Sequence, residues 1–153
     1  MKNIKIISFA LVVVMLLFAF SAMGQKTYLN ENNTPNQIKE FVHTHFPNHV
    51  ITKVKKEVNP LKIKYELKLH PKVEIEFDEN FNIIELESKN GIPLATLPVE
   101  LQKYFKNNDI NVLIKEWEKK EEGHKVKLLD GRKLYFNNKG DFVGEKNKGY
   151  YKY

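Results

Sequence analysis

Three histidines that lie close together are the first residues of this sequence that could do chemistry. They are His43, His45 and His49, and a neutral imidazole is a common ligand of transition metals. The spacing of His45 and His49 would place both side chains on one face of a helix, but Pro47 lies between them and favours the end of a helix. Because a metal site needs three or four converging ligands, we expect neither a metal nor a cofactor. A small-ligand or metal carrier that uses these histidines is the alternative function.

Two glutamates, Glu74 and Glu76, are the second group that could do chemistry, because they lie on one face of a predicted strand. A pair of carboxylates can act as acid and base in glycoside hydrolysis. The lysine-rich strands expected beside them favour an ion-paired, solvated surface instead. The sequence contains no cysteine for thiol chemistry, no Gly-rich phosphate loop and no nucleophile elbow. We therefore expect no catalytic residues and a protein that is not an enzyme.

The charge of the chain argues against a nucleic-acid partner. The formal net charge is +6, and Arg132 is the single arginine. Proteins that read nucleic acid usually rely on arginine forks for bases and phosphates. Here the lysines alternate with glutamates, as in residues 115–118, which is typical of a solvated surface.

The first 24 residues have the pattern of a secretory signal peptide. Lys2 and Lys5 precede an apolar run over residues 6–20, and the small residues Ala22 and Gly24 follow it. The run is shorter than the roughly 20 residues that a membrane span needs. We expect cleavage after Gly24, a periplasmic or secreted protein, and no stable membrane span after cleavage.

The elements that must position the candidate residues occur twice. A helical apolar pattern follows Pro35, and another follows Pro98. Each is followed by segments with strict apolar and polar alternation, which predicts antiparallel strands with one buried face. Leu69 precedes Leu128 by the same number of positions as Phe77 precedes Phe136, so the strands are duplicated as well.

The duplication predicts an α+β fold: a tandem repeat of one helix plus about four antiparallel strands, with the helices packed on one face of the sheet. The opposite face would be polar and exposed. The expected organisation is a signal peptide at 1–24, a flexible lead-in at 25–33, a first repeat at 34–87, a linker at 88–96, a second repeat at 97–146, and an aromatic and basic tail at 147–153.

The exposed sheet face is the predicted place for a partner. If Ile114 points inward, simple alternation puts Trp117 outward, and Tyr135 is outward by the same reasoning. Aromatic side chains ringed by charge are typical of binding hot spots, although Trp117 could equally cover a core edge. The candidate partner-binding residues are Trp117, Tyr135, Lys125, Lys127, Lys133, Glu74 and Glu76.

The order of these motifs resembles the PepSY-like proteins of Bacteroidetes-type envelopes, which are similar in fold to the beta-lactamase-inhibitory protein. The matching stretches are residues 35–85 and 98–145, each with a proline, a helix, apolar strands and turns. In the first stretch, Pro71-Lys72 and Phe81 depart from the usual Asp-Gly and Gly. The resemblance implies a secreted or periplasmic protein whose curved sheet binds an envelope or extracellular protein or peptide, with an inhibitory or regulatory effect. Fold alone does not identify that partner.

Overall fold

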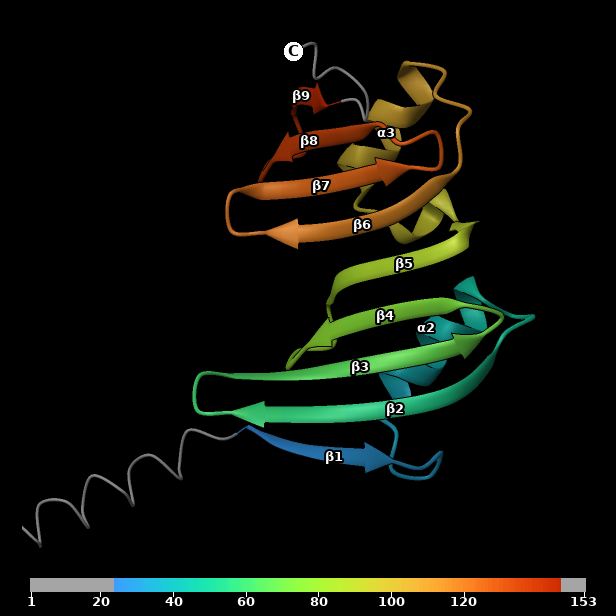
Figure 1. The fold of residues 1–153 in the computed structure, drawn as a ribbon, viewed down its shortest axis with the longest axis vertical. Coiled ribbons are helices and arrows are strands. Elements are labelled where there is room, and N and C mark those ends of the chain that lie inside the picture. The colour runs from blue at the N-terminus through green and yellow to red at the C-terminus, as the bar shows by residue number, and fades with distance from the viewer. Residues whose placement is uncertain (1–23, 147–153) are drawn as a thin grey trace, which may run out of the picture.

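The computed structural model describes residues 24–146, so the expected tail and all but the last residue of the expected signal peptide lie outside the described range. Within it, nine antiparallel strands form one sheet, and their order across the sheet is their order along the chain (Figure 1). Each strand therefore pairs with the next one along the chain, which requires only local connections. The strands are β1 (Gln25–Leu29), β2 (Val50–Asn59), β3 (Lys62–His70), β4 (Val73–Asp78), β5 (Ile83–Ile92), β6 (Ile114–Lys120), β7 (Gly123–Leu128), β8 (Lys133–Asn137) and β9 (Phe142–Lys146).

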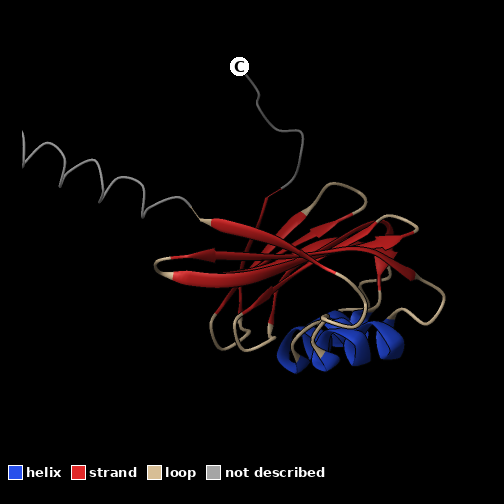
Figure 2. Cartoon of the chain, turned by 90° about the horizontal axis from the view of Figure 1, so that it is seen from below, coloured by secondary structure: helices blue, strands red, loops and turns tan. Residues whose placement is uncertain are grey.

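Two α-helices of the described residues, α2 (Asn36–His45) and α3 (Val99–Asn107), lie on the same side of the sheet (Figure 2). Each begins directly after a proline, which is tolerated there because the first N–H groups of a helix have no partner within it. A short 3-10 helix, η1 (Leu94–Thr96), precedes α3. None of the helices in residues 24–146 is long and apolar enough to span a bilayer.

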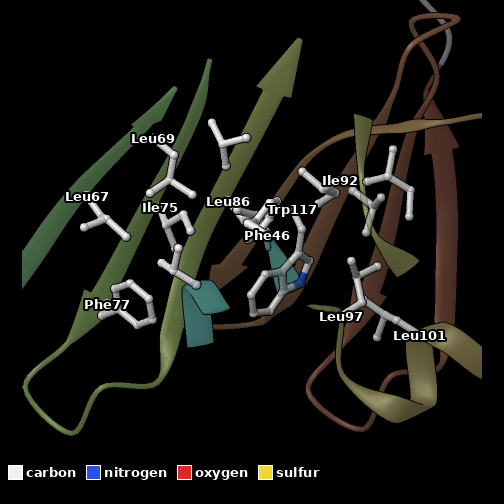
Figure 3. Packing of buried hydrophobic residues seen from close by; sticks show 14 of the residues in the cluster. Phe46, Leu67, Leu69, Ile75, Phe77, Leu86, Ile92, Leu97, Leu101 and Trp117 are labelled. Atoms are coloured by element: carbon white, nitrogen blue, oxygen red, sulfur yellow. The ribbon is translucent and has the colours of Figure 1, made fainter. Parts of the chain in front are cut away.

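The core lies between the helices and the strand side chains that point toward them. Ile38 and Val42 of α2, and Leu101 and Phe105 of α3, are buried. They belong to a single hydrophobic cluster that also includes the inward residues of the strands. Figure 3 shows Trp117 of β6 inside this cluster, and its register partner on β5 is Leu86. Because β5 and β6 pair directly, the core is continuous from one repeat to the next.

The duplication extends to the irregularities of the strands. The pairing of β2 with β3 shifts register between Ile51 and Lys53, and the pairing of β6 with β7 shifts between Ile114 and Glu116. A bulge adds one residue to one strand of a pair and locally interrupts the alternation of side chains. Since both bulges occur at equivalent places, they belong to the repeated unit.

Two of the predicted boundaries were wrong. The lead-in at 25–33 is not irregular throughout, because Gln25–Leu29 forms the edge strand β1 and pairs with β2. Its side chains are largely exposed, so it carries little apolar alternation. The predicted linker is not a loop at its start, because β5 continues to Ile92. Gly91 has a φ of +92°, a backbone conformation that glycine adopts readily and other residues rarely do.

Candidate functional site

The sheet has one face that the helices do not cover (Figure 2), which we call the open face. Side chains alternate between the two sides of a strand, so the neighbours of the buried Leu67, Leu86 and Val126 point to the open face. The strand registers arrange these neighbours in two rows across the sheet. One row contains Lys55, Glu66, Glu76, Glu85, Glu118, Lys125 and Tyr135. The other contains Lys53, Lys68, Glu74, Glu87, Glu116, Lys127 and Lys133.

The middle of the open face is acidic and its flanks are basic. Three adjacent strands, β4, β5 and β6, contribute two glutamates each, and we call this group the central acidic strip. Its members are Glu74, Glu76, Glu85, Glu87, Glu116 and Glu118. Like charges directly opposite each other on neighbouring strands destabilise a sheet, so the strip stores electrostatic repulsion.

Lysines from the flanks neutralise much of this repulsion. In the first half, Lys68 Nζ lies 2.7 Å from Glu74 Oε1, and Lys64 Nζ lies 3.1 Å from Glu76 Oε1. In the second half, Lys125 Nζ lies 2.7 Å from Glu116 Oε1 and 2.6 Å from Glu118 Oε2. The strip is therefore held by ion pairs at both of its borders.

The pKa values of the paired groups shift in the direction that favours their charged forms. Partial burial acts to raise the pKa of Glu116 and of Glu118, but hydrogen bonds from lysines outweigh it and leave both pKa values lowered. Lys125 contacts both carboxylates, and the two hydrogen bonds raise its pKa despite the opposing effect of burial. The ion pairs therefore keep Glu116, Glu118 and Lys125 charged at neutral pH.

Glu85 is the exception within the strip. Among the ion pairs of the described residues, none includes Glu85. Its Cα register partners are Glu76 on one side and Glu118 on the other. Burial raises the pKa of Glu85, and the charges of Glu76 and Glu118 raise it further. The centre of the open face thus presents a carboxylate whose charge is poorly compensated.

Six of the seven predicted partner-binding residues lie on the open face. Tyr135 is paired with Lys125 across β7 and β8, and Lys127 is paired with Lys133. Lys146 Nζ lies 5.6 Å from the centroid of the Tyr135 ring. Tyr135 and the lysines therefore make the surface of β7 and β8 basic and aromatic, and Glu74 and Glu76 lie in the acidic strip.

The seventh residue, Trp117, was placed wrongly. Only 4% of its surface is exposed, and its side chain points into the core (Figure 3). The bulge between Ile114 and Glu116 adds one residue, so alternation counted from Ile114 arrives at the wrong face. Trp117 therefore belongs to the core rather than to a binding surface.

Sequence reasoning missed the four other glutamates of the strip, although a signal for them exists. Leu86 is flanked by Glu85 and Glu87, and Trp117 is flanked by Glu116 and Glu118. An apolar residue between two glutamates predicts an inward side chain between two outward carboxylates. Reading both triplets as strand segments would have identified the acidic strip.

The three neighbouring histidines do not converge. His43 and His49 border a cavity of about 590 Å³ between α2 and the β1–β2 edge of the sheet. His45 instead packs against Phe41, with ring centroids 4.6 Å apart. Within residues 24–146, no group of three or more His, Cys, Asp or Glu side chains is arranged to hold a metal ion. The histidines therefore give no support to a metal carrier.

Both repeats match the sequence profile of one protein family. Residues 22–85 and 84–144 match the sequence profile of a family described as "Putative beta-lactamase-inhibitor-like, PepSY-like". No curated protein matches this sequence.

Solved structures from Bacteroides share the fold. A "putative periplasmic protein" of Bacteroides vulgatus is 22% identical, with a TM-score of 0.72 over 80% of this chain and 98% of the other. A "putative calcium-regulated periplasmic protein" of Bacteroides thetaiotaomicron is 24% identical, with a TM-score of 0.70 over 80% and 97%. A second Bacteroides vulgatus protein, a "putative periplasmic protein of unknown function", is also 24% identical, with a TM-score of 0.69 over 82% and 100%. Likeness at these identities concerns the fold alone.

Proposed function

The chain belongs to the PepSY-like family, and from this premise we propose that it is a non-enzymatic binding module of the cell envelope. Its partner is a protein or peptide that lies on the open face. A periplasmic or secreted location is supported by the signal pattern of the first 24 residues and by the periplasmic names of the structural neighbours. The family description, inhibitor-like, supports a regulatory or inhibitory effect of binding.

One observation carries this proposal: Glu85 lies between Glu76 and Glu118 without an ion pair among the described residues. A lysine or arginine of a partner placed over Glu85 would relieve the repulsion within the row. Charge complementarity of this kind directs the approach of a partner and fixes its orientation. We therefore expect the partner to present a basic segment to the strip, with acidic groups toward the lysines at the borders.

The state of the other carboxylates supports binding rather than hydrolysis. Glu74 and Glu76, the pair that could serve as acid and base, are each held by a lysine, Lys68 or Lys64. A catalytic acid or base must be free to contact its substrate. Each of these two carboxylates already has a lysine partner, so the pair forms part of an ion-paired surface.

A charge reversal at the centre of the strip tests the proposal. The full chain, carrying an affinity tag, would be used to recover partners from the native envelope, and recovered proteins would be identified by mass spectrometry. Glu85→Lys should reduce recovery of the specific partner at least about tenfold, because a like charge against a basic segment costs more than about 1.4 kcal/mol. Tyr135→Ala should reduce recovery as well, since the same surface is used.

The matched control is Glu40→Lys, which makes the same charge change on an exposed position of α2, on the other side of the sheet. It should leave recovery unchanged. If Glu85→Lys and Glu40→Lys recover the same proteins in the same amounts, the open face is not the binding surface.

A further inference from the structure

The two repeats differ at two equivalent core positions. On the helices, Val42 of α2 corresponds to Phe105 of α3, since each is the second buried residue of its helix. On the strands, Val54 is paired with Leu67 just after the bulge of β2, and Trp117 is paired with Val126 just after the bulge of β6. The second repeat therefore has two aromatic rings where the first has two valines.

A cavity borders these two valines in the first repeat. Phe105 and Trp117 are 3% and 4% exposed. In the first repeat, Val42 and Val54 are 5% and 3% exposed and border the cavity of about 590 Å³ beside β1. Its volume is within the roughly 300–1,000 Å³ that is typical of small-ligand sites. At these two positions, the side chains of the first repeat are smaller than those of the second.

The lining of the cavity has an apolar part and a charged rim, in which Glu31 is the one acidic residue among those that the structure describes. Phe46 and Ile51 extend the apolar surface beyond the two valines. Lys39 and His43 both border the cavity from α2, and their i, i+4 spacing places them one turn apart on the same helix face. Lys39 Nζ lies 3.5 Å from the backbone oxygen of Glu31, and no carboxylate among the described residues forms an ion pair with it.

We propose that this cavity binds a small aromatic carboxylate, with its ring against Val42 and Val54 and its carboxylate at Lys39 and His43. The ring takes the volume that aromatic side chains fill in the second repeat. The carboxylate meets the ammonium group at the rim. This site lies on the helix side of the sheet and is independent of the partner surface proposed for the open face.

Indole-3-propionate is a suitable probe because it joins an indole, the ring of Trp117, to a carboxylate. Isothermal titration calorimetry with the full chain should show saturable binding to a single site. The neutral amide of the same compound should bind about two- to five-fold more weakly, as expected for the loss of one partly exposed ion pair. Equal binding of acid and amide would overturn the assignment of an anionic ligand.

Substitutions copied from the second repeat test the location of the site. Val54→Trp and Val42→Phe should each place a ring where the ring of the ligand is proposed to lie and abolish binding, while thermal unfolding shows that the variants remain folded. Leu61→Trp is the matched control, since Leu61 is 99% exposed at the tip of the β2–β3 hairpin, and it should bind the probe like the unmodified protein. Undiminished binding by folded Val54→Trp or Val42→Phe would overturn the proposal.

A charge variant tests the rim without changing the core. Lys39→Gln introduces the residue that stands at the corresponding position of α3, Gln102. It should weaken indole-3-propionate about two- to five-fold and leave the amide unaffected. Lys62→Gln, an equal charge change at the exposed start of β3, should change neither. If the unmodified chain shows no saturable heat with either compound, the cavity is not a site for this class of ligand.

Discussion

The carboxylate of Glu85 is expected to weaken the sheet, because like charges directly opposite each other on neighbouring strands are destabilising. Glu76 and Glu118 lie opposite it on the two neighbouring strands. We predict that Glu85→Gln raises the free energy of unfolding by about 0.2–1 kcal/mol at neutral pH, the range for cross-strand pairs. Urea denaturation of the two proteins measures the difference. Glu40→Gln, on the exposed surface of α2, should change stability by less than about 0.5 kcal/mol.

The gain from Glu85→Gln should depend on pH, and its sign follows from the raised pKa of Glu85. Folding favours the protonated form of this carboxyl, so the charged form lowers stability above the folded-state pKa. Below the ordinary glutamate pKa of about 4.3, Glu85 is neutral in both the folded and the unfolded state. The stabilities of the unmodified protein and of Glu85→Gln should therefore converge as the pH falls from neutral to about 4.3. A constant difference across the range would contradict the electrostatic origin.

At the level of the elements, sequence alternation was sufficient wherever a strand is regular. The alternating segments that contain Leu69, Phe77, Leu128 and Phe136 form β3, β4, β7 and β8, and these four residues are buried. The outward position predicted for Trp117 was wrong, because alternation was carried across the bulge of β6. The bulge itself has no turn signature in the sequence. The edge strand β1 was missed for a different reason: its exposed side chains provide almost no pattern.

The hairpin between β7 and β8 depends on a glycine at its open end. Gly123 has a φ of +146° and is paired with Asn137. A Cβ there would overlap the carbonyl oxygen of Phe136 and lie 2.8 Å from Asn137 Cα. We predict that Gly123→Ala lowers the free energy of unfolding by at least about 1–3 kcal/mol, the cost of the strained backbone alone. Thermal or urea denaturation would measure the loss.

Gly144 of β9 is the matched control for this substitution. A Cβ at Gly144 would meet nothing within 4 Å, so Gly144→Ala should change stability by less than about 0.5 kcal/mol. Equal losses for the two variants would mean that general strand preference, rather than the close approach at Gly123, determines the effect.

At the level of the whole molecule, the sheet separates two possible binding surfaces. The central acidic strip lies on the face that the helices leave uncovered (Figure 2). The cavity beside α2 lies on the helix side. The sequence could predict the open face in outline, because the alternation of charged and apolar residues is visible along each strand. It could not predict the cavity, because that space depends on which side chains two distant segments bring together. Only the alignment of Val42 with Phe105 and of Val54 with Trp117 on the fold reveals the difference.

The continuous core predicts how the two repeats unfold. Repeats that contact each other weakly can unfold separately, since their stability is a sum of local terms. Here β5 and β6 pair across the boundary, Leu86 is opposite Trp117, and a single hydrophobic cluster includes residues of both halves. We therefore predict one cooperative transition in urea. The fluorescence of Trp117, the single tryptophan, and the far-ultraviolet circular dichroism of the whole sheet should give the same midpoint.

Gly123→Ala provides a sharper version of this test, because it perturbs the second repeat only. In a single cooperative unit, the loss of stability must lower both midpoints equally. If the halves were independent, the dichroism of the first repeat would keep its original midpoint and the transition would split in two. Coincident shifts would mean that the junction at Leu86 and Trp117 couples the repeats, so that a ligand bound in the cavity of the first half would also stabilise the second.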